Sequence, residues 1–146
     1  MTEILPIAEE HLCAVAEIEQ LCFCEPWSED SLRMLTRDGG AGFVALVDGK
    51  VAAYGGMLCV LDEGQITNIA THPLFRRRGL GAAIVDALSE HAKNNGITSI
   101  FLEVRESNQA ARSLYTAAGF EKIGMRKRFY RAPVEDAVLM RRSIDA

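Results

Sequence analysis

The sequence predicts one α/β (α+β) domain in which helices flank a mixed central β-sheet. Its 146 residues suit a single domain, so we expect residues 1–146 to fold together. Between residues 65 and 104 a strand pattern, a long helical pattern and a second strand pattern follow one another, which predicts a parallel strand pair. Asp48-Gly49 between two apolar runs predicts an antiparallel hairpin. A sheet with both kinds of pairing is mixed.

The first part of the chain is expected to form two helices. Residues 8–22 are amphipathic, with glutamates opposite an apolar stripe. The stripe consists of Leu12, Val15, Ile18 and Cys22. Ser28 is a suitable N-cap for a second helix that stops at Gly39-Gly40.

The predicted hairpin pairs residues 43–47 with residues 50–60 across the Asp48-Gly49 turn. Inside its second strand, Gly55-Gly56 indicates either a bulge or a close approach of another backbone. Residues 65–71 continue the sheet as the next strand.

The remaining elements alternate between helix and strand. A long helix over 79–94 ends at Asn95-Gly96, and a strand follows over 99–104. Asn108 is expected to cap a helix that closes on Gly119. Residues 121–131 and 136–142 form a last strand pair, with the turn around Ala132-Pro133. The predicted order is α-α-β-β-β-α-β-α-β-β.

Composition limits the classes of function. The hydrophobic fraction of 49% and charged fraction of 25% are ordinary for a soluble globular protein. A net charge of −4 argues against a general nucleic-acid binder and is compatible with a cationic substrate. Three charges at 126–128 could contact ribosomal RNA, although a solvated strand face is the commoner explanation. We expect no direct contact with nucleic acid.

The cysteines and the absence of long apolar runs predict a cytoplasmic protein. Cys22 and Cys24 could form half of a metal site, but no second Cys or His pair stands at ligand spacing, so free thiols and no metal are expected. Free thiols suit a reducing compartment. No apolar run approaches the roughly 18 residues of a membrane span, and the first residues are too acidic for a signal peptide.

Residues 76–85, RRRGLGAAIV, carry the strongest functional signal. The first N–H groups of a helix have no intrahelical partners, and the helix dipole is positive there. Glycines at 79 and 81 remove Cβ atoms that would keep a ligand away, and three arginines add cationic donors. The pattern therefore predicts a phosphate or pyrophosphate site, whereas the alternative is that the arginines only solvate the surface.

Two standard phosphate motifs do not fit this turn. A P-loop would need a lysine followed by Ser or Thr, and neither is present. A dinucleotide-binding turn would need a third glycine where Ile84 stands, and it would follow its strand directly.

Arg76-Arg77-Arg78-Gly79-Leu80-Gly81 resembles the R/Q-x-x-G-x-G/A signature of the GNAT family of N-acetyltransferases. The stretch N-Q-A-A-R-S-L-Y-T-A-A-G-F, residues 108–120, is similar to the family's second signature. The stretches EPWSED, ITNIATHP, LEVRESN and FYRAPVEDAVLM resemble the RimI-type group, which acetylates the N-terminal amine of a small-subunit ribosomal protein.

The resemblance implies a GNAT fold and acetyl-coenzyme A as cosubstrate. It implies that the glycine turn holds the pyrophosphate and that the backbone of the strand at 69–71 pairs with the pantetheine arm. The cofactor-binding residues implied in this way are Ile69, Ala70, Thr71, Arg76, Arg77, Arg78, Gly79, Leu80, Gly81, Ala82 and Asn108.

Transfer from a thioester to an amine needs a base for the amine and benefits from an acid for the leaving thiolate. Alternation places Phe101, Glu103 and Arg105 on one strand face, where Glu103 could be a base or could pair with Arg105 or another arginine. Tyr115 could be a core residue of its helix or a functional group. The resemblance favours Glu103 as the base and Tyr115 as the acid. His72, before a proline, is expected to be solvated rather than catalytic.

The acceptor is the least readable part of the site. Tyr130 and Trp27 lie in segments that resemble the acceptor side of RimI-type proteins, although Trp27 could equally be core packing. The expected acceptor is the α-amine of Ala or Ser at the N-terminus of a small-subunit ribosomal protein. A lysine, a small-molecule amine, and a non-catalytic acetyl-coenzyme A sensor are the alternatives. A monomer or weak oligomer with no membrane partner is expected.

Overall fold

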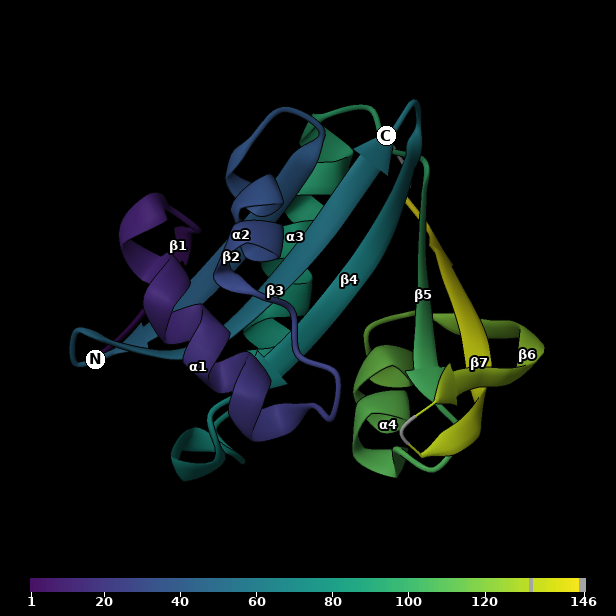
Figure 1. Cartoon of the computed structure of the whole chain (residues 1–146). Helices are drawn as coiled ribbons and strands as arrows, with labels where there is room; N and C mark the ends of the chain where they lie inside the picture. The colour runs from purple at the N-terminus through teal and green to yellow at the C-terminus, as the bar shows by residue number, and fades with distance from the viewer. Residues whose placement is uncertain (132, 145–146) are drawn as a thin grey trace.

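The computed structural model describes residues 1–131 and 133–144, and its centre is a seven-stranded mixed sheet (Figure 1). The strand order is β1-β2-β3-β4-β5-β7-β6. The strands are β1 (Thr2–Pro6), β2 (Gly40–Val47), β3 (Lys50–Val60), β4 (Glu63–Thr71), β5 (Ser99–Arg105), β6 (Glu121–Arg131) and β7 (Val134–Ser143). The helices are α1 (Leu12–Cys22), α2 (Glu29–Leu32), α3 (Leu80–Asn94) and α4 (Gln109–Ala117).

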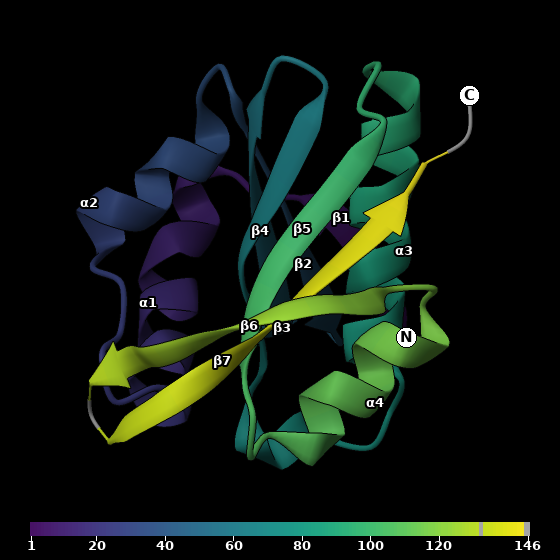
Figure 2. The same cartoon turned by 90° about the vertical axis from the view of Figure 1, so that its right-hand side faces the viewer.

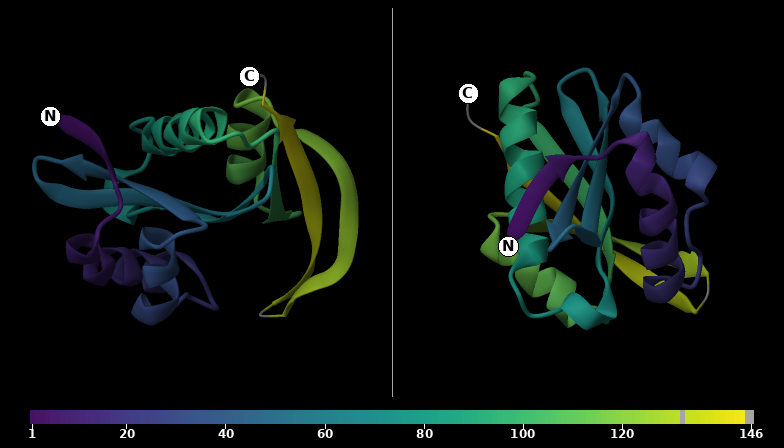
Figure 3. Two further views of the ribbon diagram at one scale, coloured as in Figure 1. Left: turned by 90° about the horizontal axis from the view of Figure 1, so that it is seen from above. Right: turned by 90° about the vertical axis from the view of Figure 1, so that its left-hand side faces the viewer.

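Helices cover both faces of the sheet. Seen from the side and from above, α1 and α2 lie on one face and α3 on the other, with α4 below β5 on the side of α3 (Figures 2 and 3). Each face has its own apolar core, one around α3 and α4 and one under α1 and α2. The predicted fold class is therefore confirmed. No helix within residues 1–131 and 133–144 is long and apolar enough to span a membrane.

The predicted order lacked one strand. β1 precedes the first helix and pairs antiparallel with β2, from Thr2 opposite Val47 to Pro6 opposite Phe43. All five residues of β1 are exposed or half-buried. A strand without a fully buried face needs no alternation of apolar and polar residues, so the sequence does not reveal it. Contact with β2, rather than a local pattern, makes this segment a strand.

The predicted element boundaries are otherwise confirmed to within a few residues. Ser28 accepts a hydrogen bond from Ser31 N at 3.1 Å, and Asn108 accepts one from Ala111 N at 3.1 Å, so both cap helices as expected. The turn at Asp48-Gly49 has positive φ at both residues, which is the geometry of a tight hairpin turn. β6 and β7 form the last antiparallel pair. Ala132, in the turn predicted between them, lies outside the described residues.

At Gly55 the structure shows the predicted bulge and a close approach of side chains rather than of another backbone. The β3–β4 register shifts between Gly55 and Met57, which is a bulge. A Cβ atom at Gly55 would lie 2.4 Å from Ile84 Cγ2, so the missing side chain allows α3 to pack closely on β3.

One prediction about α1 is wrong. The glutamates of this helix were expected on the exposed side, and Glu19 is instead fully buried. It lies four residues after Val15, on the stripe that faces the sheet. Its carboxylate accepts hydrogen bonds from Trp27 N at 2.8 Å, from Asn68 Nδ2 at 3.1 Å and from the Tyr54 hydroxyl. Burial raises the pKa of Glu19 above its ordinary value of 4.5, although these hydrogen bonds lower it in part.

Candidate active site

The site is built around the separation of β4 from β5. The two strands pair in parallel only where Glu63–Gln65 lie opposite Ser99–Phe101, and beyond that point they diverge (Figure 1). The final residues of β4, Ile69–Thr71, pair with β3 on one side only. On the side of β5 no strand within residues 1–131 and 133–144 pairs with their backbone, where the Thr71 carbonyl accepts a hydrogen bond from Cys22 Sγ at 3.5 Å, and an extended ligand can join this edge.

The start of α3 has the properties of an anion site. Gly79 is the N-cap, with a φ of +74°, and it provides no side chain to cap the helix. The first N–H groups of α3 therefore have no capping partner from this residue, and the helix dipole is positive at the same place. Arg76, Arg77 and Arg78 just before it are exposed. This combination fits a phosphate group.

The two glycines of this turn have different roles. Gly79 adopts a left-handed conformation, and a Cβ atom there would meet open space. A Cβ atom at Gly81 would instead lie 3.1 Å from Leu114 Cδ2 on α4. Gly81 was expected to make room for a ligand, and the structure shows that it also makes room for the neighbouring helix.

Two of the three arginines contact nearby side chains. The Arg76 guanidinium donates to Cys22 Sγ at 3.7 Å, and Arg78 lies 5.2 Å from the centre of the Phe75 ring. These contacts hold the arginines beside the end of β4 and the start of α3. The cysteines are free thiols, as expected, within the described part of the chain.

Glu103 projects from β5 on the face opposite α3 and α4. Its neighbours Leu102 and Val104 are buried in the core on the side of α3, so Glu103 faces the other way. It is half-buried, and its Oε2 accepts a hydrogen bond from Gln65 Nε2 at 2.8 Å. Arg105 forms an ion pair with Glu135 at 3.2 Å. The Arg105 guanidinium is therefore engaged by Glu135.

Tyr130 lies close to Glu103. Burial and the negative charge of Glu103 raise the pKa of the Tyr130 phenol to about 12, with the nearby Arg105 guanidinium acting in the opposite direction. Arg105 lies 4.3 Å from the centre of the Tyr130 ring, in cation–π geometry. Glu135 in turn accepts a hydrogen bond from Ser107 N at 2.6 Å. Tyr130 is thus held against the end of β5.

Tyr115 lies on the other side of the sheet. It belongs to the core around α3 and α4 and makes an edge-to-face contact with Phe120, with 5.8 Å between ring centres. Burial raises the pKa of its phenol, and Tyr130 adds to this effect. Within residues 1–131 and 133–144 the hydroxyl of Tyr115 has no hydrogen-bond partner. Tyr115 is both a core residue and a phenol that keeps its proton.

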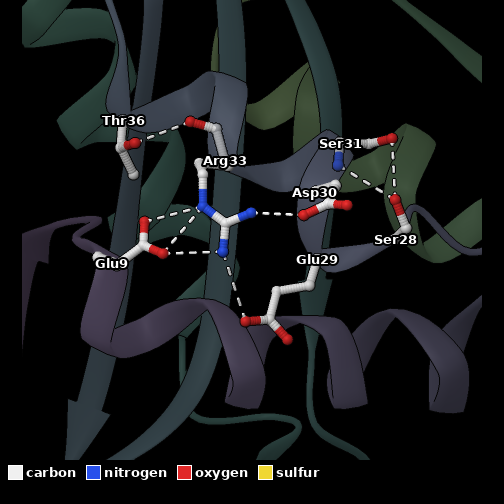
Figure 4. A network of polar contacts seen from close by, with 7 residues as sticks. All are labelled: Glu9, Ser28, Glu29, Asp30, Ser31, Arg33 and Thr36. Carbon is white, nitrogen blue, oxygen red and sulfur yellow. Dashed lines mark hydrogen bonds and ion pairs between the residues drawn. The ribbon is translucent and has the colours of Figure 1, made fainter.

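The loop between α1 and α2 lies on the face that carries Glu103, and polar contacts fix both of its ends. Trp27 is half-buried against the core under α1, and its backbone N–H donates a hydrogen bond to Glu19 at 2.8 Å. Arg33 pairs with Glu9 at 2.8 Å and with Asp30 at 2.6 Å, which ties α2 to the segment just before α1 (Figure 4).

His72 has a structural role. Its Nδ1 accepts a hydrogen bond from Leu74 N at 3.1 Å, which caps the short turn that leads into the three arginines.

Gln65 is the site residue that the sequence did not indicate. Its strand was predicted, but its contact with Glu103 depends on the register between β4 and β5. Glutamine in a strand is not a recognisable signal by itself, so this contact becomes visible only in the structure.

The comparisons with known proteins agree with this geometry. Residues 12–120 match the model of the acetyltransferase (GNAT) family. The [ribosomal protein bS18]-alanine N-acetyltransferase of Escherichia coli K12 is 34% identical over 142 residues, which cover 96% of each chain. The protein of the same name from Haemophilus ducreyi is 33% identical over 140 residues, covering 92% of this chain and 94% of the relative.

Solved structures give the same result. The crystal structure of the ribosomal-protein-S18-alanine N-acetyltransferase from Escherichia coli has a TM-score of 0.92 and covers 100% of this chain, with 96% of its own length matched. The structure of Ard1 from Thermoplasma volcanium has a TM-score of 0.90 at 25% identity, with 99% of both chains covered. Because sequence and fold agree over nearly its whole length, the chain belongs to the GNAT acetyltransferase family and is an N-acetyltransferase.

Proposed function

We propose that this enzyme transfers the acetyl group of acetyl-coenzyme A directly to the α-amine of a protein N-terminus. The proposed acceptor is an Ala or Ser residue at the start of a small-subunit ribosomal protein. The observation that carries the proposal is the position of Glu103, half-buried and beside Tyr130, where β4 leaves β5. The names of the relatives at 33–34% identity support the choice of acceptor.

The residues present fit acetyl-coenzyme A. The uncapped start of α3 and the exposed Arg76–Arg78 suit its pyrophosphate. The edge formed by Ile69–Thr71 suits its extended pantetheine arm. Asn108 already caps α4 through Oδ1, so its amide nitrogen is the group left for the coenzyme. When bound, acetyl-coenzyme A supplies an activated thioester.

The two proposed catalytic groups act from opposite faces of the sheet. Glu103 accepts a proton from the acceptor amine, through water, on the face that carries Trp27 and Tyr130. Tyr115 donates a proton to the departing sulfur from the side of α3 and α4. The new C–N bond forms as the C–S bond breaks, and no covalent enzyme intermediate or metal is needed.

An α-amine is better matched to this base than a lysine side chain. The ordinary pKa of an α-amine is about 8, and that of lysine is about 10.4. Deprotonating lysine near neutral pH therefore costs roughly 3 kcal/mol more, at about 1.36 kcal/mol per pKa unit. One carboxylate acting through water can more easily deprotonate the α-amine, because the free-energy cost is smaller than for lysine.

The test is thiol release from acetyl-coenzyme A with two peptides. The first is the free N-terminal segment of a small-subunit ribosomal protein, and the second is the same peptide with a blocked N-terminus and an internal lysine. Turnover with the first alone is the expected result. Turnover with the second alone would assign the enzyme to lysine side chains. Turnover with neither, despite tight coenzyme binding, would leave a small-molecule acceptor or a sensor domain.

A further inference from the structure

Gln65 occupies a distinctive position in the sheet. It is the last residue of β4 that pairs with β5 before the strands separate, and it lies opposite Phe101. Its side chain points to the same face as Glu103, two residues further along β5, and bridges the two strands at the point of separation. The backbone ladder ends here, and the side-chain contact between Gln65 and Glu103 continues the link between the strands.

The contact uses one oxygen of the carboxylate. Gln65 Nε2 donates to Glu103 Oε2 at 2.8 Å, which is a short distance for an N–H donor and is typical of a charged acceptor. Glu103 Oε1 accepts no hydrogen bond from any residue in the described ranges 1–131 and 133–144. The two oxygens belong to one rigid planar carboxylate, so a hydrogen bond to Oε2 restrains the rotation of the group and the direction in which Oε1 points.

The surroundings of this pair favour a defined geometry. Both side chains line a cavity of about 270 Å³ on the open face of β5 and β7, together with Phe101, Ile123 and Leu139. The apolar members of this lining offer no competing hydrogen bond to the carboxylate. Arg126 also lines the cavity, but its guanidinium lies over the Phe129 ring, 5.7 Å from the ring centre, and forms no ion pair with Glu103 within residues 1–131 and 133–144. A water molecule in this cavity could bridge Oε1 to an amine.

We propose that Gln65 is a positioning residue for acetyl transfer: it holds Oε2 of Glu103 so that Oε1 stays open to the proton that comes from the acceptor amine through water. This inference rests on the proposed role of Glu103 as the base. Gln65 lies four residues before the strand edge assigned to the pantetheine arm. Its effect should therefore appear in the catalytic step and not in coenzyme binding.

The experiment is a double-mutant cycle with Gln65→Met and Glu103→Gln, measured as kcat and as KM for acetyl-coenzyme A and for the peptide. Methionine has nearly the same length as glutamine and lacks the donor. In the wild-type background Gln65→Met is expected to lower kcat about tenfold, within the range that misplacing a reacting group by less than 1 Å costs. In the Glu103→Gln background it is expected to change kcat less than about twofold, because residues that act through each other are not additive.

Three controls separate positioning from general damage. Gln20→Met makes the same change at an exposed residue of α1 and should leave kcat unchanged. Gln65→Asn keeps the amide on a shorter arm and should behave like Gln65→Met, because its donor no longer reaches Glu103. The thermal unfolding midpoint of each variant shows whether the fold is intact.

The outcomes distinguish a failure of the positioning role of Gln65 from a failure of the base role of Glu103. If Glu103→Gln alone leaves kcat unchanged, Glu103 is not the base and both ideas fall. If Glu103→Gln lowers kcat but Gln65→Met does not, only the positioning role is wrong. Equal losses from Gln65→Met in both backgrounds would mean that Gln65 acts independently of Glu103, which also overturns the inference.

Discussion

At the scale of single residues, the two proposed catalytic groups have environments that suit different tasks. Glu103 is half-buried and retains an open oxygen on the acceptor face. Tyr115 is 6% exposed, and burial keeps its phenol protonated. A base must remain accessible to the acceptor amine or to a bridging water molecule. An acid needs only its hydroxyl to be accessible to the leaving sulfur. β5 places Glu103 in a half-buried position, and α4 places Tyr115 in the core.

The proposed base role predicts a pH-dependent effect of Glu103→Gln. At pH 7 the variant should lose about 100-fold in kcat/KM, which is the typical contribution of general base catalysis. Above the amine pKa of about 8 the acceptor loses its proton without help, so the loss should shrink. Rates from pH 6.5 to 9.5 with the free peptide check this. A constant loss across that range would contradict the base role.

The proposed acid role predicts that Tyr115→Phe slows transfer without weakening coenzyme binding. The ring and its edge-to-face contact with Phe120 remain, so the packing of α4 is kept. We expect kcat to fall about 10- to 100-fold and the Kd for acetyl-coenzyme A to change less than about twofold. Calorimetric titration and steady-state rates measure the two quantities. A large loss of affinity would instead make Tyr115 a structural residue.

Strand alternation and the family resemblance suggested Glu103 as the base, and the second signature suggested Tyr115 and Asn108, so these three proposed site residues could be named from the sequence. The sequence did not locate Gln65 or the burial of Glu19. Both depend on which elements pack together, and a helix pattern with several glutamates does not show which one faces the sheet. Tertiary packing decides such cases, not local preference.

At the scale of elements, most boundaries could be predicted because caps and glycines mark them. Ser28, Asn108 and the Asp48-Gly49 turn each have a local cause that can be read from the sequence. β1 has no such signal, since its pairing with β2 is the reason it is a strand. The separation of β4 from β5 is equally invisible in the sequence, because strand patterns do not show where a ladder ends.

The start of α3 provides the test at this scale, with Gly81→Asp compared with Gly81→Asn. Both side chains crowd Leu114 in the same way, because a Cβ atom at Gly81 already lies 3.1 Å from it. Only Asp adds a negative charge beside the proposed pyrophosphate site. We expect the Kd for acetyl-coenzyme A to be about 10- to 100-fold weaker in the Asp variant than in the Asn variant, with a smaller gap at high salt.

Equal affinities for the Asp and Asn variants would mean that Gly81 serves only the packing of α4. A gap that does not depend on salt would indicate a change in the shape of the turn. The unfolding midpoint of the Asp variant should equal or slightly exceed that of the Asn variant, because their shapes match and a carboxylate is favourable in the first turn of a helix.

At the scale of the whole molecule, the sheet consists of two parts that share a short ladder. β1–β4 form one part and β5–β7 the other, and they pair only over Glu63–Gln65 and Ser99–Phe101. The proposed acceptor side and the proposed coenzyme side meet where that ladder ends. The hydrogen bond between Gln65 and Glu103 joins the two parts at the same point.

Glu19 joins the elements behind the acceptor side. Its carboxylate links α1 to Trp27 in the following loop, to Tyr54 on β3 and to Asn68 on β4. Removing it as Glu19→Ala would leave these donors without their partner in a buried place, at a cost of about 1–3 kcal/mol for each group that stays unsatisfied. Chemical denaturation at one pH would measure this loss.

The same carboxyl predicts a dependence of stability on pH. Because burial raises the pKa of Glu19 in the folded protein, the folded state binds its proton more tightly than the unfolded state, whose value is near 4.5. From pH 4.5 up to the raised pKa, this group therefore makes the free energy of unfolding fall as pH rises. Glu19→Gln is neutral throughout and should lack that contribution. Relative to wild type it should gain stability as pH rises through this window, in denaturation curves recorded at pH 4.5, 5.5, 6.5 and 7.5. A constant difference between the two proteins would mean that Glu19 has the same proton affinity in both states.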